Sequence, residues 1–561
     1  MKWWNKILKH QNLILALLFL AANIFLLLPV LGNNQFFPSH DDTWIIRLQQ
    51  FDRAIKLGQI PPRLAPDMAF GFGYPIFVYY APLFTFLSWI FLKIVGSYSL
   101  AVVLTIIFVN FLGTWGMFLL AKKFFGTGGG VIAALAFTFL PYRALDIYVR
   151  GALAELAALS FLPFFFYFFF GLFEGKKRKK NALGLVLVAV GFILSHNLML
   201  IILTYLFLPF LILAFWQLLR HRLPWRWPIL VALLVLFLSA FYWLPMITGL
   251  DNVQAIREAQ KTLFSDHFVY LSQLWDWPWG FGGSAPGLGD GISFKIGKVH
   301  LLLALGGLAA LVLAKKWQKE TVCLFILGLS SLFFSLSYSS FFWENLPYLA
   351  VVQFPWRFLG PLGLAVSFFS GAIVLLPKLS FFSKLPKILE IAGAGLIIFI
   401  SITGLIYFNL KYFKPHFKIY QADEVYLTPE KISQAAKAIA DYLPRWASIW
   451  PQEKPVQAVE AREEEVTISL DSPYKITFRL QERKPGEIIA NRFYFPGWGA
   501  KSTSGGKIGL EPEEGRGRIV FVSQVGENEE ITLFFAPTLV EKIGIAFSIL
   551  GLILLLVVVF Y

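Results

Sequence analysis

Long apolar runs separated by short basic loops are the feature that most restricts how this chain can fold. Of its 561 residues, 57% are hydrophobic and only 15% are charged, whereas a soluble globular domain has about a quarter of its residues charged. The first run, residues 13–31, is long enough to cross a bilayer at about 1.5 Å per helical residue. The sequence therefore predicts a polytopic α-helical membrane protein with about 12 spans.

The basic residues predict the orientation of the spans. The formal net charge of +15 could suggest nucleic acid, but lysines and arginines gather in short loops such as Lys122-Lys123 and Lys176–Lys180. This distribution is typical of cytoplasmic loops, and it argues against a nucleic-acid partner. Lys2, Lys6 and Lys9 place the N-terminus in the cytoplasm. We expect a multi-pass protein of the plasma membrane, in contact with membrane lipid, with a large first outer loop at residues 32–97.

The composition changes after residue 408, which divides the chain into three parts. Residues 1–408 form the predicted transmembrane domain. Residues 409–540 are more charged and form a predicted extracytoplasmic α+β domain, mostly β and sandwich-like, with a helix at 428–442. Residues 541–561 form a closing transmembrane helix. The strands are expected at residues 465–470, 474–480, 487–494, 518–522 and 530–535, because apolar and polar residues alternate there between turn residues.

The first outer loop opens with His40, Asp41 and Asp42 just after the first span. Residues 44–56 have helical periodicity, and Gly58 closes this amphipathic helix. Asp42 or Thr43 could act simply as the N-cap of that helix. The apolar run 75–95 is interrupted by Pro82, so we expect an interfacial or re-entrant helix there.

Other ionisable or polar groups lie at the predicted outer ends of the spans. Such groups are costly near a membrane and are therefore site candidates. We expect residues 141–151 to be an outer loop. The candidates are Arg143, Asp146, Arg150, Glu155, His196, Asn197 and Arg357.

These residue types suit glycosyl transfer from a lipid-phosphate donor. The reaction needs a carboxylate that takes the acceptor proton or holds a metal, and Asp42 is the first candidate, with Asp41 second. The two carboxylates could together hold a divalent cation, Mg²⁺ or Mn²⁺. Positive charge is needed on the leaving phosphate, for which the candidates are Arg150, Arg357 and Arg143. Candidates for substrate binding are His40, Glu155, His196 and Asn197.

Several of these residues also have a structural interpretation. Arg150 and Glu155 could merely pair with each other at a helix end. His196-Asn197 could form an ordinary turn, and Arg357 could extend toward the membrane surface. The stretch Trp275–Trp279 suits carbohydrate stacking, and it equally suits an aromatic anchor at the membrane interface.

With these residues in view, the chain resembles the GT-C superfamily of polyprenyl-phosphate-sugar-dependent glycosyltransferases, through the Asp pair after the first span. Arg150-Gly151 followed by Glu155 is similar to the second acidic motif of oligosaccharyltransferase catalytic subunits, although only Glu155 matches its acidic positions. A finer resemblance is to the YfhO-like membrane proteins, catalogued as "6-pyruvoyl-tetrahydropterin synthase related". It includes Tyr79 and Tyr80 as further candidates for substrate binding. The segments that carry it are Gly71–Pro75, Tyr79–Leu83, Ser195–Asn197, Gln353–Phe358 and Tyr494–Trp498.

The resemblance implies an integral membrane enzyme of cell-envelope glycan biosynthesis. Such an enzyme moves a sugar from a polyprenyl-phosphate or pyrophosphate donor to an extracytoplasmic glycan, lipid, protein or cell-wall acceptor, with inversion. Inversion needs one base and an in-line attack, which suits a site with one dominant carboxylate. The alternatives are a transporter or flippase for polyprenyl-linked glycans or lipids, and a non-catalytic membrane scaffold. The pterin chemistry in the family name does not fit, because no histidines have the spacing of a zinc site.

Overall fold

The structure is a computed structural model of the chain. It describes residues 10–32, 34–174, 177–220, 224–378, 386–461, 465–480, 486–503, 507–522 and 530–560. The basic residues Lys2, Lys6, Lys9, Lys176 and Arg222, which carried part of the predicted orientation, lie outside these ranges. The chain forms two compact units, each made of three segments: residues 1–42, 86–235 and 262–420, and residues 43–85, 236–261 and 421–561.

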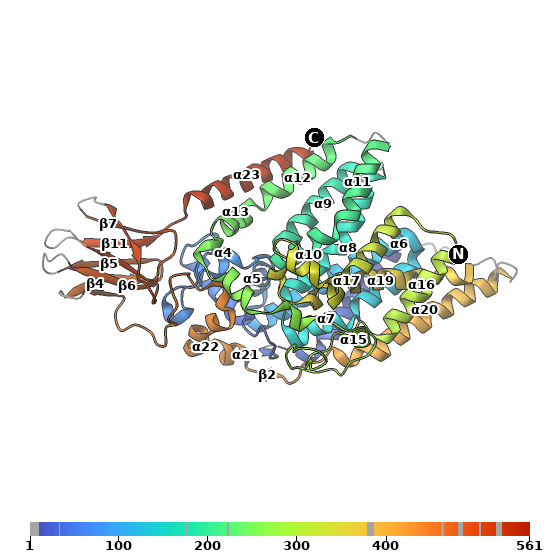
Figure 1. Cartoon of the computed structure of the whole chain (residues 1–561), viewed down its shortest axis with the longest axis horizontal. Helices are drawn as coiled ribbons and strands as arrows, with labels where there is room; N and C mark the ends of the chain where they lie inside the picture. The colour runs from blue at the N-terminus through green and yellow to red at the C-terminus, as the bar shows by residue number, and fades with distance from the viewer. Residues whose placement is uncertain are drawn as a thin grey trace. The chain divides into compact units, whose positions relative to one another are not determined.

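The first unit is almost entirely helical (Figure 1). Among the described residues of this unit, one small sheet pairs β1 (Gln35–Phe36) with β2 (Ile419–Tyr420). Two of the boundaries between the segments of the two units fall within α5 (Leu83–Val95) and α12 (Arg226–Leu238). The main helices within the unit are α2 (Gln11–Leu27), α6 (Tyr98–Thr138), α7 (Pro141–Leu145), α8 (Leu153–Phe173), α9 (Arg178–Ile193), α10 (Asn197–Leu206), α11 (Leu208–Arg220), α15 (Leu271–Trp275), α16 (Lys298–Leu313), α17 (Lys319–Ser335), α18 (Ser340–Asn345), α19 (Leu359–Ser370) and α20 (Lys387–Asn409).

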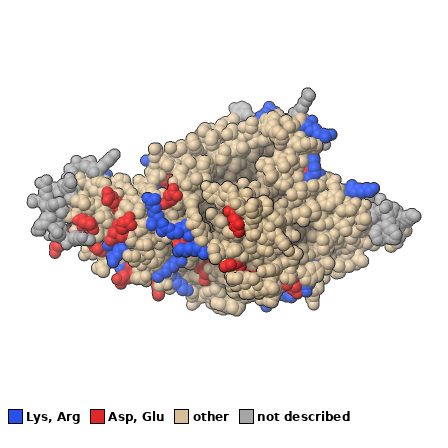
Figure 2. All heavy atoms as spheres, in the orientation of Figure 1, with Lys and Arg blue, Asp and Glu red and all other residues tan. Residues whose placement is uncertain are grey.

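The apolar helices make the chain a membrane protein, and charged side chains are sparse over much of the face in Figure 2. Six helical segments of the described chain have the length and composition of a bilayer span, or eight if each of two bent helix pairs is one span. The helices α9, α16 and α17 have 16, 16 and 17 residues, which is short of the about 20 that a span needs. The total of about 12 spans therefore stays a prediction.

Helix α6 is a hairpin of two helices that meet at Gly126. The backbone there has φ 76° and ψ −176°, a conformation that glycine adopts without steric cost. The hydroxyls of Thr114 and Thr138 lie 2.7 Å apart, so the second half runs back beside the first. The two halves correspond to apolar runs at residues 100–121 and 130–141, which lie on either side of Lys122-Lys123.

The expectation that residues 141–151 form a loop is wrong. Residues Pro141–Leu145 form α7, and Asp146–Arg150 continue as a π turn, η3. Every residue from 141 to 151 is buried. The charged residues in this segment favoured a loop in the sequence, because several of the partners that allow their burial come from distant parts of the chain.

Two other apolar runs fold as bent pairs of helices. Residues 198–219 divide into α10 and α11, which meet at 57°, and residues 228–245 divide into α12 and α13 (Ala240–Thr248), which meet at 68°. Pro209 lies just after the first bend. Since proline lacks an N–H and clashes with the preceding turn, it favours a break at this position.

The second unit combines short helices, two sheets and the last helix. Its α3 (Trp44–Lys56) confirms the predicted amphipathic helix, and Gly58 follows with φ 86°. Helix α13 packs along α23 (Leu539–Phe560), as Figure 1 shows. Gly544 permits this close approach, because a Cβ there would lie 2.7 Å from the Ala240 carbonyl oxygen. The other helices are α4 (Ile76–Tyr79), α14 (Ala255–Lys261), α21 (Ala422–Tyr426) and α22 (Pro429–Gln434), the last continuing as η11 (Ala435–Tyr442).

The strands form two antiparallel sheets that pack face to face (Figure 1). One sheet has the order β3-β6-β10-β9 and the other β4-β5-β11-β7-β8. Ile488 and Ile519 from the first sheet share one core with Phe478 and Leu533 from the second. The arrangement confirms a β-sandwich. The strands are β3 (Val459–Ala461), β4 (Val466–Ser472), β5 (Lys475–Leu480), β6 (Glu487–Phe493), β7 (Trp498–Ser502), β8 (Lys507–Ile508), β9 (Glu511–Pro512), β10 (Arg518–Val522) and β11 (Glu530–Phe535).

Candidate functional site

A buried ion cluster lies where α7, η3 and α8 meet. The Arg150 guanidinium bonds to Asp146 Oδ1 at 2.5 Å and to Glu155 Oε2 at 2.8 Å. The Tyr142 hydroxyl donates to Glu155 Oε1 at 2.6 Å. Both carboxylates have no exposed surface. The pairing of Arg150 with Glu155, which the sequence left open, is therefore present, and Asp146 joins it.

The local sequence explains how these groups converge. Pro141 begins α7, and the wider π turn of η3 places Asp146 and Arg150 on one side of the helix. Gly151 then adopts the left-handed conformation with φ 65° and ψ 24°, which ends the turn at low steric cost. Glu155 follows in the first turn of α8, where the helix dipole favours a negative charge.

Arg357 and its neighbour complete the cluster from the segment before α19. The indole ring of Trp356 lies 4.4 Å from the Arg150 guanidinium carbon. Arg357 Nε is 3.9 Å from Glu155 Oε2, and its Nη1 donates to the Val352 carbonyl oxygen at 2.9 Å. His196 lies within electrostatic reach of Glu155. We call Tyr142, Asp146, Arg150, Glu155, Trp356 and Arg357 the buried charged cluster.

The first loop lies directly beside this cluster. The amide nitrogens of His40 and Asp41 donate to the carbonyl oxygens of Val149 and Arg150, both at 2.9 Å. A side chain at Gly151 would meet Ser39 Oγ and would come within 2.8 Å of the Asp41 carbonyl oxygen. The structure thus brings the predicted Asp pair next to Arg150, although about a hundred residues separate them in the sequence.

A second contact ties the first loop to the long segment before α16. His40 Nε2 lies 3.1 Å from the Phe281 carbonyl oxygen. The Phe281 ring stacks on His416 with a centroid distance of 4.6 Å. His40 is exposed, while Asp41 and Asp42 are partly exposed. Of the two candidate caps of α3, Thr43 is the N-cap, and no side chain caps the helix there.

Several other candidates have structural partners. Arg143 is buried with 1% of its surface exposed and bonds to Asn110 and, at 3.0 Å, to Ser160. His196 is the N-cap of α10, where its Nδ1 accepts from the Met199 amide at 3.1 Å, and Asn197 begins the helix.

Tyr79 and Tyr80 belong to the second unit. The Tyr79 hydroxyl donates to the Gly249 carbonyl oxygen at 2.6 Å, and its ring stacks on Tyr442 at 5.7 Å. The Tyr80 ring packs 4.3 Å from the Arg47 guanidinium carbon.

Sequence reasoning did not single out Tyr142 and Trp356, which contact the charges directly. Each stands beside a candidate that was named, Arg143 or Arg357. The sequence signal that could have identified Tyr142 and Trp356 is an aromatic residue next to an arginine, and this signal is weak in an apolar chain. The charges of the cluster balance, since two arginines face two carboxylates.

Comparison with known families gives the class of the helical part. Residues 80–243 match the family model described as "Dolichyl-phosphate-mannose-protein mannosyltransferase". This stretch includes α7, η3 and α8, which carry four of the six residues of the buried charged cluster. The match supports the resemblance to the GT-C superfamily of membrane glycosyltransferases. None of the curated proteins compared with the chain is significantly similar to it in sequence.

Two solved structures are similar over most of the chain. One is the oligosaccharyltransferase of Archaeoglobus fulgidus tethered to an acceptor peptide, with 13% identity and a TM-score of 0.49, covering 82% of this chain and 62% of that one. The other is ArnT from Cupriavidus metallidurans bound to undecaprenyl phosphate, with 13% identity and a TM-score of 0.38, covering 76% and 77%. The chain thus spans about three fifths of the oligosaccharyltransferase.

Proposed function

We propose that this protein transfers a sugar from a polyprenyl-phosphate or pyrophosphate donor to an extracytoplasmic acceptor, with inversion at the anomeric carbon. The observation that carries the proposal is the hydrogen bond from the Asp41 amide to the Arg150 carbonyl oxygen. It joins the main chain of the Asp pair to that of Arg150, which supports a site shared by these residues. The family match of residues 80–243, which concerns lipid-phosphate-sugar transfer, supports the same class.

In the proposed reaction, Asp42 takes the proton from the acceptor hydroxyl, with Asp41 as the second candidate. The acceptor oxygen forms a bond to the anomeric carbon from the face opposite the phosphate. The bond between that carbon and the phosphate oxygen breaks, and the phosphate leaves with the electron pair. One carboxylate is sufficient as base for a single displacement.

Arg357 is the better placed of the arginines to stabilise the leaving phosphate. Its side chain is 13% exposed, while that of Arg150 is 8% exposed and is paired with two carboxylates. Arg150 then acts mainly by holding Glu155, and Glu155 in turn orients Arg357. A guanidinium suits this role, because its donors match phosphate oxygens in pairs.

The donor set also allows a divalent cation, which we retain as a proposal. No group of three or more histidine, cysteine or acidic side chains that could hold a metal occurs among the described residues. Mg²⁺ is commonly held by only one or two carboxylates together with substrate phosphate and water. Asp41 and Asp42 fit that arrangement, and the ion would supply positive charge near the phosphate.

The orientation follows from the sequence and belongs to the same proposal. Basic residues prefer the cytoplasmic side of a membrane, which places the N-terminus and the basic loops there. The first loop and the β-sandwich follow the other ends of the apolar runs, so they are extracytoplasmic. The active site then faces the outer surface of the plasma membrane, where a lipid-linked donor and a cell-envelope acceptor can meet.

The proposal is tested with purified protein and a panel of polyprenyl-phosphate sugars labelled in the sugar. A cell-envelope extract supplies the acceptor. If the protein transfers the sugar, the acceptor becomes labelled and unlabelled polyprenyl phosphate or pyrophosphate is released. The two bent helix pairs favour a transporter as the second candidate, since interrupted spans are typical of that class. A transporter would instead move the intact labelled lipid across proteoliposomes. Movement without cleavage would contradict the enzyme and support this alternative.

A further inference from the structure

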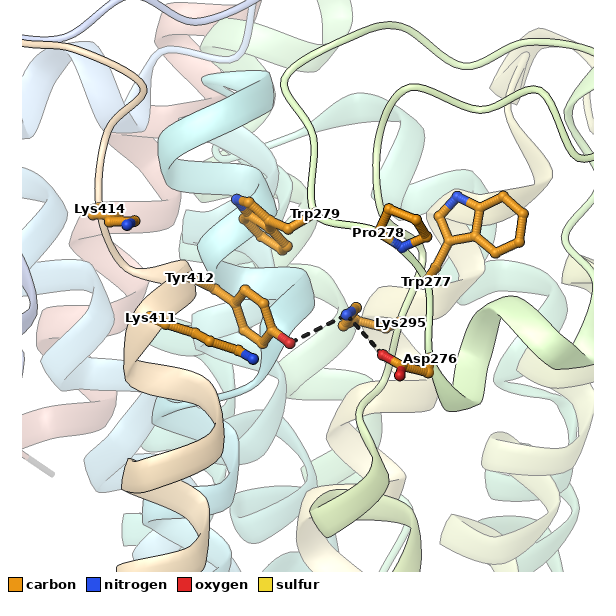
Figure 3. Close-up of a pocket in the computed structure, with 8 residues that line it drawn as sticks. All are labelled: Asp276, Trp277, Pro278, Trp279, Lys295, Lys411, Tyr412 and Lys414. Carbon is orange, nitrogen blue, oxygen red and sulfur yellow. Dashed lines mark hydrogen bonds and ion pairs between the residues drawn. The ribbon is translucent and has the colours of Figure 1, made fainter.

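A basic, aromatic cavity of about 580 Å³ lies in the first unit, away from the buried charged cluster's paired ions. Figure 3 shows it between the loop after α15 and the end of α20. It is lined by Asp276, Trp277, Pro278, Trp279, Lys295, Lys411, Tyr412 and Lys414. Three lysines thus face one carboxylate, so the cavity carries excess positive charge, whereas the charges of the buried cluster balance.

Lys295 forms the floor of the cavity. It is only 5% exposed, and its ammonium donates to Asp276 Oδ1 and to the Tyr412 hydroxyl, both at 3.1 Å (Figure 3). Lys298 also pairs with Asp276, at 2.6 Å. These two lysines lower the pKa of Asp276, so the carboxylate stays ionised and holds the floor in place. Lys411 and Lys414 are exposed and remain available to a ligand from water.

The aromatic side chains form one wall. The rings of Trp279 and Tyr412 pack with a centroid distance of 4.7 Å and an angle of 31° between them. The indole nitrogen of Trp279 is buried and has no hydrogen-bond partner among the described residues. Trp277 is fixed by a bond from its indole nitrogen to the Asp290 carbonyl oxygen at 3.4 Å.

Two types of group therefore line the cavity: the lysine side chains and the flat aromatic side chains. A sugar ring presents C–H groups that pack on an indole face and oxygens that accept hydrogen bonds. An acidic group on the sugar would pair with the lysines. We propose that this cavity binds an anionic saccharide, a sugar that carries a carboxylate or phosphate group.

The position of the cavity suggests what the saccharide does. Trp279 is two residues before Phe281, whose carbonyl oxygen contacts His40, and Asp41 and Asp42 directly follow His40 in the sequence. A saccharide held at Trp279 would thus extend toward the first loop. Its role as the acceptor rests on the proposed function, while its binding rests on the cavity alone.

The test is direct binding to the full-length protein in nanodiscs, measured by calorimetry. The probes are an oligogalacturonate, its methyl ester, which has the same chain without charge, inorganic phosphate, and a polyprenyl-phosphate sugar. We expect the acid to bind and the ester to bind about tenfold more weakly, because it lacks the charge-assisted contacts. The double variant Lys411→Gln/Lys414→Gln should weaken binding of the acid about tenfold and leave the ester unchanged. Trp279→Ala should weaken both.

Lys316→Gln is the matched control, because it removes an exposed lysine beyond the other end of α16 and should change nothing. Equal binding of acid and ester, no binding of either, or binding of the polyprenyl-phosphate sugar alone would overturn the proposal. Inorganic phosphate that binds as tightly as the acid would reduce the cavity to a nonspecific anion site and would also overturn it. Asp42→Asn should bind the acid normally, so normal binding together with undiminished transfer in this variant would count against the proposed function only.

Discussion

The Asp41 amide donates a hydrogen bond to the Arg150 carbonyl oxygen at 2.9 Å, and this bond joins the first loop to the buried charged cluster. The neighbouring bond from the His40 amide to Val149 makes the contact a short two-bond pairing. Because main-chain atoms form it, the contact fixes where the Asp pair lies without using the carboxylates.

Glu155→Gln should destabilise the first unit strongly. The change removes the charge that faces Arg150 at 2.8 Å in a buried place, and breaking a buried ion pair typically costs about 3–5 kcal/mol. We expect a clear fall in the thermal unfolding temperature in detergent. Glu174→Gln is the control, since Glu174 is 51% exposed and pairs with Lys123, and an exposed pair contributes about 0–1 kcal/mol. Equal shifts in the two variants would contradict the assigned role of the cluster.

Gly151→Ala should displace the first loop and reduce transfer far more than it reduces stability. The added Cβ would meet Ser39 and lie 2.8 Å from the Asp41 carbonyl oxygen. Gly96→Ala is a matched control, because Gly96 also has a positive φ, 73°, but has no atom within 4 Å of the added Cβ. Both changes carry the left-handed strain of about 1–2 kcal/mol. If the two variants lose transfer equally, the loss is caused by backbone strain alone, and the contact between Gly151 and the first loop does not contribute to transfer.

Arg63→Lys should destabilise the second unit. Arg63 pairs with Glu541 at the start of α23 and donates to the carbonyl oxygens of Ala536 and Pro496 at 3.0 and 2.9 Å. A lysine cannot reproduce this planar fork, and the loss should approach the about 3–5 kcal/mol of a broken buried pair. The matched change Arg53→Lys alters a 46% exposed pair with Asp67 and should have little effect. Limited proteolysis of the β-sandwich measures its unfolding, and it should reveal faster cleavage in Arg63→Lys than in Arg53→Lys.

The loop that leads to the cavity should loosen as the pH falls. Burial lowers the pKa of His267 below its ordinary value of about 6.5, although Asp266 and Asp290 act in the opposite direction. Between the lowered pKa and about 6.5, the unfolded form binds more protons, so the free energy of unfolding decreases as the pH decreases through this window. His267→Gln should flatten that dependence, as followed by proteolysis of residues 262–297. An identical slope in the variant would exclude His267 as its source.

Local patterns in the sequence predicted elements that depend on local periodicity. Helix α3 and the strands β4, β5, β6, β10 and β11 lie within two residues of their expected bounds. Strands β8 and β9 have two residues each and are too short to show alternation. The reversal at Gly126 was also predictable, because apolar runs on either side of Lys122-Lys123 must change direction.

The charged turn at residues 141–151 was not predictable, because its helical state depends on distant partners. Asp146 and Arg150 are stable in a buried π turn only since Glu155, Tyr142 and Trp356 surround them. In the sequence alone, the same charges favour an exposed loop. The closeness of Asp41 to Arg150 was a hypothesis from topology. The structure specifies this contact through main-chain hydrogen bonds, which cannot be predicted from the pattern of side chains.

The central claim is that a carboxylate of the first loop acts as the base. It is tested most directly by measuring transfer from polyprenyl-phosphate sugars in membranes with Asp41→Asn and Asp42→Asn made separately. The account predicts that Asp42→Asn loses at least about a hundredfold in rate, the contribution of a positioned general base, while Asp41→Asn loses less. Transfer at the wild-type rate in both variants, with both proteins folded, would contradict it.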